Sequence, residues 1–120
     1  MEEMSIITGV RVEIVSEASG VTRPLAGFYR DQVRWKAVMP AVGHTVAPGR
    51  LGPALARLIG YAPIIGIEHH PGTATDPWPD APVVVVRVVW DQPLDNATVA
   101  AITADGWALY DIRQDPRFFR

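Results

Sequence analysis

The densest group of side chains with possible chemistry lies near the middle of the chain and comprises Glu68, His69, His70 and Asp76. Carboxylate and imidazole groups serve as general acids and bases, and they bind metals where no cysteine is present. On an extended strand Glu68 and His70 share one face and His69 takes the other, so the two histidines do not share a metal ion. The spacing matches no known metal motif. We therefore treat these residues as acid–base candidates and predict neither a metal nor a cofactor.

A second group interleaves basic and aromatic side chains and comprises Arg30, Arg34, Trp35 and Lys36. Sheets that stack bases and neutralise phosphates are built in this way. A solvated strand face with Trp35 in the core explains the same pattern, and the net charge of −2 disfavours nucleic-acid binding.

A glycine-rich segment, residues 49–53, precedes a predicted helix and includes Arg50. Backbone N–H groups at a helix start favour anions. The segment lacks the lysine, the hydroxyl residue and the spacing of a phosphate-binding loop, so we interpret it as a turn.

The element best able to position such side chains is the apolar run of residues 82–90, which we predict to be the central strand of a sheet. Alternation gives this strand one wholly apolar face suited to carry helices, formed by Val84, Val86, Val88 and Trp90. The opposite face consists of Val83, Val85, Arg87 and Val89.

The first strand, residues 6–15, is expected beside the central strand. Arg87 is then expected to pair with Glu13 and to leave Arg11 free. Valines around a single arginine are too apolar for comfortable exposure, so this face predicts a contact surface. The residues of the predicted interface are Arg11, Glu13, Val83, Val85, Arg87 and Val89.

Further strands are expected at residues 62–70 and 107–112, and helices at 53–59 and 96–105, the second capped by Asp95 and ended by Gly106. Residues 83–112 then form a strand–helix–strand unit whose strands run parallel. The element order predicts an α+β domain with a ferredoxin-like, split βαβ sheet, two helices on one face, and an irregular insertion around residues 22–50. The alternative is a five-stranded α+β sheet in which residues 27–39 form a hairpin with the first strand.

The composition indicates one globular domain over residues 1–120, with 48% hydrophobic residues and 20% charged residues. Of the eleven basic residues only Lys36 is a lysine, a bias typical of a GC-rich bacterial or phage genome. The absence of cysteine excludes disulfides and thiolate chemistry. The apolar runs are too short to span a membrane and the start lacks a signal-peptide pattern, so we expect a cytoplasmic protein without membrane contact.

The sequence favours a small non-enzymatic module that forms a homodimer, or docks a partner protein, through its open sheet face. The alternative is a small enzyme, cofactor-independent or metal-assisted, that uses Glu68, His69 and His70 on a small-molecule ligand. The third hypothesis is nucleic-acid binding through the strand that carries Arg30 and Lys36.

Overall fold

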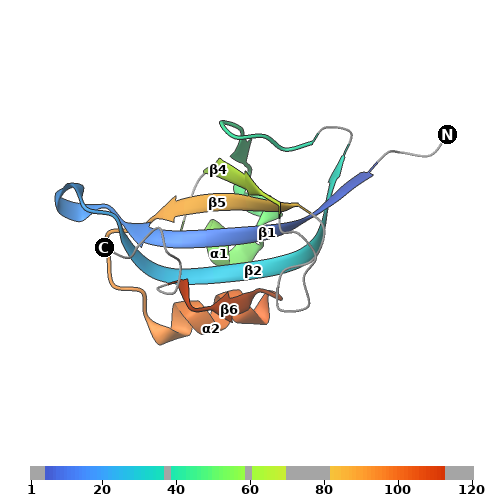
Figure 1. Cartoon of the computed structure of the whole chain (residues 1–120). Helices are drawn as coiled ribbons and strands as arrows, with labels where there is room; N and C mark the ends of the chain where they lie inside the picture. The colour runs from blue at the N-terminus through green and yellow to red at the C-terminus, as the bar shows by residue number, and fades with distance from the viewer. Residues whose placement is uncertain (1–4, 37–38, 59–60, 70–81, 113–120) are drawn as a thin grey trace.

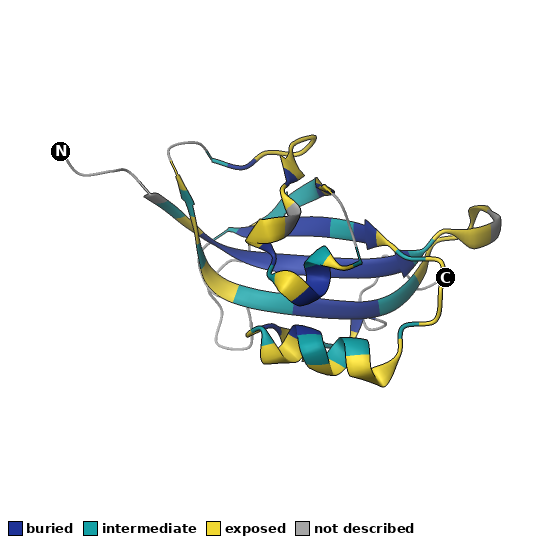
Figure 2. Cartoon of the chain, turned by 180° about the vertical axis from the view of Figure 1, so that it is seen from behind, coloured by how far each residue is buried: buried dark blue, intermediate teal, exposed yellow. Residues whose placement is uncertain are grey.

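The computed structural model describes residues 5–36, 39–58, 61–69 and 82–112, which form one mixed sheet with two short helices. The strands are β1 (Ser5–Ser16), β2 (Arg23–Lys36), β3 (Thr45–Val46), β4 (Ala62–Glu68), β5 (Val83–Val89) and β6 (Ala108–Tyr110). The helices are α1 (Pro53–Ala56) and α2 (Asn96–Ala104), with single 3₁₀ turns η1 (Ala18–Gly20) and η2 (Pro48–Arg50). Strands β5, β1 and β2 cross the middle of the molecule (Figure 1), and the helices lie in front of the sheet when it is seen from behind (Figure 2).

The sheet has the strand order β3-β4-β5-β1-β2-β6. Strands β1 and β5 are parallel, and every other neighbouring pair is antiparallel. The α+β class is confirmed, but the ferredoxin-like arrangement is wrong because β2 separates β1 from β6. Strands β5 and β6 do run in the same direction, as predicted for residues 83–112, with β1 and β2 between them.

Strand β2 replaces the irregular insertion predicted around residues 22–50, and its hairpin with β1 agrees with the alternative fold. The sheet has six strands instead of five, because β3 adds a short edge strand. The register of β2 shifts opposite Gly9, where Gln32 adopts a φ of 54°. This bulge changes which residues face the core, from Phe28 and Arg30 before it to Val33 and Trp35 after it. The shift therefore breaks the regular alternation of apolar residues along β2.

Helix α2 is close to its prediction. The Asp95 carboxylate accepts a hydrogen bond from the Thr98 backbone N–H at 2.7 Å, and Gly106 follows the helix with a φ of 98°. Such a cap and a left-handed glycine satisfy the unpaired groups at the two helix ends. Helix α1 is shorter than predicted and ends at Ala56.

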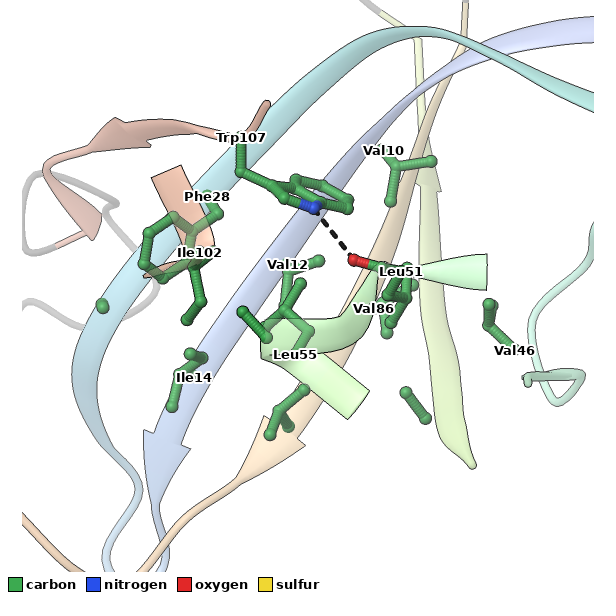
Figure 3. Packing of buried hydrophobic residues seen from close by; sticks show 14 of the residues in the cluster. Val10, Val12, Ile14, Phe28, Val46, Leu51, Leu55, Val86, Ile102 and Trp107 are labelled. Atoms are coloured by element: carbon green, nitrogen blue, oxygen red, sulfur yellow. Dashed lines mark hydrogen bonds between the residues drawn. The ribbon is translucent and has the colours of Figure 1, made fainter. Parts of the chain in front are cut away.

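The hydrophobic core lies between the helices and the face of β1 and β5 that was predicted to carry them. Val84, Val86 and Val88 are fully buried there, together with Leu55 of α1 and Ile102 of α2. Figure 3 shows these helices and strands contributing to one cluster, with Phe28 and Trp107 at one end of it. Burying large aliphatic and aromatic side chains in this way supplies most of the stabilising free energy of such a domain.

Candidate functional site

The sheet face that points away from the core carries four charged side chains in a row. Arg11 holds the Glu68 carboxylate with both ends of its guanidinium, at 2.6 Å for Nη1–Oε1 and 2.7 Å for Nη2–Oε2. Glu13 lies 3.6 Å from Arg11 Nη2 and 3.3 Å from Arg87 Nη2. We call this chain of contacts, from Glu68 through Arg11 and Glu13 to Arg87, the ion network.

The ion network is largely closed to solvent. The side chain of Glu13 is fully buried and that of Arg11 is 6% exposed, whereas Arg87 and Glu68 are 25% and 32% exposed. Two carboxylates balance two guanidinium groups, which satisfies the requirement that buried charges be paired. The predicted pairing of Arg87 with Glu13 is confirmed. The expectation that Arg11 remains free is wrong, because a register shift near Ile64 in β4 places Glu68 on the same face.

The residues of the predicted interface differ widely in how far they are exposed to solvent on this face. Val83 and Val85 are buried within the chain, as are Arg11 and Glu13. Val89, at the end of β5, is 45% exposed. A partner that approached this face would therefore meet Val89 and part of Arg87 before any other member of the predicted set. Dimerisation or docking through this face stays a prediction.

Two tyrosines pack against glycines on the same face. A Cβ atom on Gly27 would lie 2.5 Å from the Tyr110 ring, and one on Gly9 would lie 2.7 Å from the Tyr29 hydroxyl. Only glycine leaves room for rings this close to the strand backbone. Burial raises the pKa of Tyr29 to about 12, with a smaller contribution from the Asp31 carboxylate.

The acid–base candidates do not assemble into a site within the described residues. Glu68 is held by Arg11, which occupies both of its oxygens, and His69 is exposed at the end of β4. His70 and Asp76 lie outside the described residues. Within the described residues, no group of three or more His, Asp or Glu side chains converges on a possible metal position.

The basic and aromatic residues, in contrast, come together around one pocket. It has a volume of about 450 Å³ and lies beside the core on the helix-bearing side of the sheet. We call it the basic pocket. All four residues of the predicted nucleic-acid strand line it, and two further residues from distant segments complete its polar and aromatic lining. These six residues are Arg30, Arg34, Trp35, Lys36, Arg50 and Trp107.

The bulge at Gln32 arranges the β2 side of the basic pocket. After it, Val33 and Trp35 point toward the core side and are half-buried, and the exposed Arg34 and Lys36 alternate with them. Strand β6 pairs with β2 only at residues 27–29, so this end of β2 has an open outer edge within the described structure. Trp35 is fixed by a hydrogen bond of 2.8 Å from its Nε1–H to the Thr8 hydroxyl.

The opposite wall is built where the start of α1 meets the end of α2. Trp107 is buried and donates its Nε1–H to the Leu51 carbonyl at 3.0 Å (Figure 3). Arg30 donates to the Asp105 carbonyl, and its guanidinium carbon lies 4.7 Å from the centre of the Trp107 ring. A cation over an indole face is a favourable contact. Arg30 and Trp107 are thus both anchored, and they form a rigid side of the pocket.

Helix α1 offers no anion site of its own, although its preceding segment suggested one. The Asp105 carboxylate accepts the Ala54 backbone N–H at 2.9 Å and occupies the start of the helix. Arg50, from the same glycine-rich segment, lines the basic pocket. Sequence reasoning missed Arg50 and Trp107 as pocket residues because they adjoin β2 only through the tertiary fold.

The charge of the basic pocket contrasts with the rest of the chain. Among the described residues, its lining includes four cationic side chains and no carboxylate. Arg34, Lys36 and Arg50 have no ion-pair partner in the described structure. Without these four, the chain has seven basic residues against thirteen acidic ones, a net charge of −6. Such a separation of charge draws anions toward the pocket.

No described helix has the length and apolar character needed to cross a membrane. Comparison with known proteins found no matching family model, no matching curated protein and no matching solved structure. The inference of function therefore rests on the geometry of the chain itself.

Proposed function

We propose that this chain is a binding module that holds an organic anion, with a planar or apolar body, in the basic pocket. The observation that carries the proposal is the convergence of four cations and two tryptophans on one pocket of about 450 Å³, in which no described lining residue is a carboxylate. That volume is typical of small-molecule sites, in which an apolar lining accompanies a few polar groups.

The distribution of burial assigns different roles to the four cations. Arg34, Lys36 and Arg50 are exposed, and Arg30 is half-buried between Trp107 and the Asp105 carbonyl. Exposed cations without carboxylate partners among the described residues bind an anion without first breaking an ion pair, and guanidinium groups bind phosphate or carboxylate with two parallel hydrogen bonds. Phosphate esters and carboxylates are therefore the expected ligand groups.

The aromatic part of the pocket supports a ligand with a ring or an apolar body. Trp35 is half-buried and its indole N–H is engaged by Thr8, so its ring is already oriented before a ligand arrives. Fixing a side chain in advance reduces the entropy lost on binding. A simple inorganic anion would make no use of this ring.

The test is a titration of isotope-labelled protein with phenyl phosphate, adenosine monophosphate and pyrophosphate, followed through the indole N–H resonance of Trp35. We expect the two aromatic anions to shift this resonance and to bind more tightly than pyrophosphate. Replacing Arg34 and Arg50 together by glutamate should weaken binding at least tenfold, since each lost charged contact contributes about 1.5–3 kcal/mol.

Arg23→Glu is the matched control, because Arg23 is an exposed cation at the other end of β2 and is absent from the pocket lining. It should bind like the native chain. The proposal is wrong if none of the anions shifts the Trp35 resonance, or if Arg23→Glu weakens binding as much as the double variant does.

A further inference from the structure

We infer that the anion held in the basic pocket is one segment of a single-stranded nucleic acid, an inference that rests on the proposed function and names its ligand class. A base would stack on Trp35, and neighbouring phosphates would meet the exposed cations of β2 and η2.

The first argument is the order of side chains at the end of β2. Arg34 and Lys36 are exposed and flank Trp35 on either side in sequence. Alternate residues on a strand lie about 6.6 Å apart. On a strand these two cations take the face opposite to Trp35, but all three residues line the basic pocket. Two cations at this spacing match the backbone of an extended single strand, whose successive phosphates they would meet while a base enters the pocket toward Trp35. A single phosphate group would need only one of the two.

The second argument is that the site is open at the strand edge. Strand β6 covers β2 only at residues 27–29, so within the described structure residues 30–36 keep a free outer edge beside the pocket. A chain can enter and leave along such an edge, whereas an isolated nucleotide is usually enclosed. Sheets that bind single strands combine a track of this kind with aromatic rings for the bases.

The third argument distinguishes the two tryptophans. The face of Trp107 is covered by the Arg30 guanidinium at 4.7 Å, and its N–H is used by Leu51. Trp35 packs partly against the core and its N–H is bonded to Thr8 at the ring edge, but no cation lies over its ring among the described residues. Trp35 is therefore the ring that we assign to base stacking, and Arg30 with Trp107 forms the supporting wall.

The experiment measures fluorescence anisotropy of labelled oligothymidylate of about ten nucleotides, with thymidine monophosphate, a duplex of equal length and heparin as competitors. We expect the oligomer to bind at least tenfold more tightly than the mononucleotide and the duplex. If three cations contact phosphates, the logarithm of the binding constant should fall with the logarithm of salt concentration with a slope of about −2.

The variants separate stacking from charge. Trp35→Phe keeps a ring and should retain most of the affinity, whereas Trp35→Ala should lose about tenfold with the salt slope unchanged. Arg34→Glu with Lys36→Glu should both weaken binding and flatten the slope, and Arg23→Glu should do neither. Because Trp35 packs against the core, the charge variants keep the test valid if the alanine variant does not fold.

Three results would overturn the inference. Thymidine monophosphate that binds as tightly as the oligomer would leave the anion pocket in place and exclude the nucleic-acid strand. If heparin or the duplex binds as tightly as the oligomer, and if Trp35→Ala leaves that affinity unchanged, the site is a general polyanion site. Absence of binding by the oligomer and by every small aromatic anion would exclude both the nucleic-acid ligand and the proposed function.

Discussion

Replacing Glu13 by glutamine tests the ion network most directly. Glu13 is fully buried, and its oxygens lie 3.3 Å from Arg87 Nη2 and 3.6 Å from Arg11 Nη2. Glutamine keeps the shape of the side chain but removes the charge, so that two guanidinium groups face the single carboxylate of Glu68. Removing one partner of a fully buried pair destabilises proteins by about 3–5 kcal/mol.

We expect a smaller loss here, about 2–3 kcal/mol in the free energy of unfolding, for two structural reasons. Arg11 keeps both of its short contacts with Glu68, at 2.6 and 2.7 Å. Arg87 is 25% exposed, so water can solvate part of the guanidinium that loses its partner. The cost therefore arises mainly from the incomplete solvation of Arg87.

Equilibrium unfolding in urea measures this loss, because urea, unlike guanidinium chloride, does not screen ion pairs. The urea concentration at the unfolding midpoint should fall, and the slope of unfolding free energy against urea concentration should stay unchanged. The double variant Glu13→Gln with Arg87→Met should be more stable than the sum of the two single changes predicts, since it removes the cation that glutamine leaves unpaired. The exposed Glu17→Gln is the control and should change stability by less than about 0.5 kcal/mol. The reasoning fails if Glu13→Gln lowers the free energy of unfolding by less than about 0.5 kcal/mol. It also fails if the loss in the double variant equals the sum of the losses in the two single variants.

Three further predictions follow from single contacts. Gly27→Ala should lower the urea midpoint strongly, because its Cβ would lie 2.5 Å from the Tyr110 ring, and adding Tyr110→Ala should recover part of the loss; no recovery would point to another cause. Asp105→Ala should cost about 1 kcal/mol of stability through loss of the cap on α1, and an unchanged midpoint would show that the cap is dispensable. Since the pKa of Tyr29 is raised to about 12, its contribution to stability should be constant below about pH 10 and fall as pH rises toward 12, because the unfolded chain loses its phenol proton first. The phenolate absorbance of the native chain minus that of Tyr29→Phe should titrate in this upper range, and a midpoint near pH 10 would contradict the assignment.

The sequence predicts those parts of the fold that depend on local patterns. Alternation along β1 and β5 is strict, so it indicates both the buried valines and the pairing of Glu13 with Arg87. The capping residue Asp95 and the glycine at 106 define α2 almost to the residue. These features need only neighbouring residues, which is why they can be derived from the chain alone.

Strand β2 and the basic pocket could be predicted only in part. The bulge at Gln32 breaks the period-two pattern, so the apolar positions of β2 fit a helix as well as a strand. Gly27 lowers strand propensity, and the reason for its presence, the Tyr110 ring, lies more than eighty residues away. Sequence patterns identified Arg34 and Trp35 as candidates. They could not show that Arg50 and Trp107 share their pocket.

The position of β5 beside β1 has a consequence for how the chain folds. The hairpin of β1 and β2 joins neighbouring segments, whereas the parallel pairing of Glu13 with Arg87 closes a loop of 74 residues. Distant contacts of this kind form late, because the loop entropy must be overcome first. Until β5 arrives, β1 is an edge strand, and Arg11 and Glu13 give that edge two charges that discourage pairing with other chains. We expect pulsed hydrogen exchange during refolding to protect the β1–β2 amides before those of β5, and simultaneous protection would refute this order. The two charges that are neutralised in the native sheet thus protect the partly folded sheet from pairing with other chains.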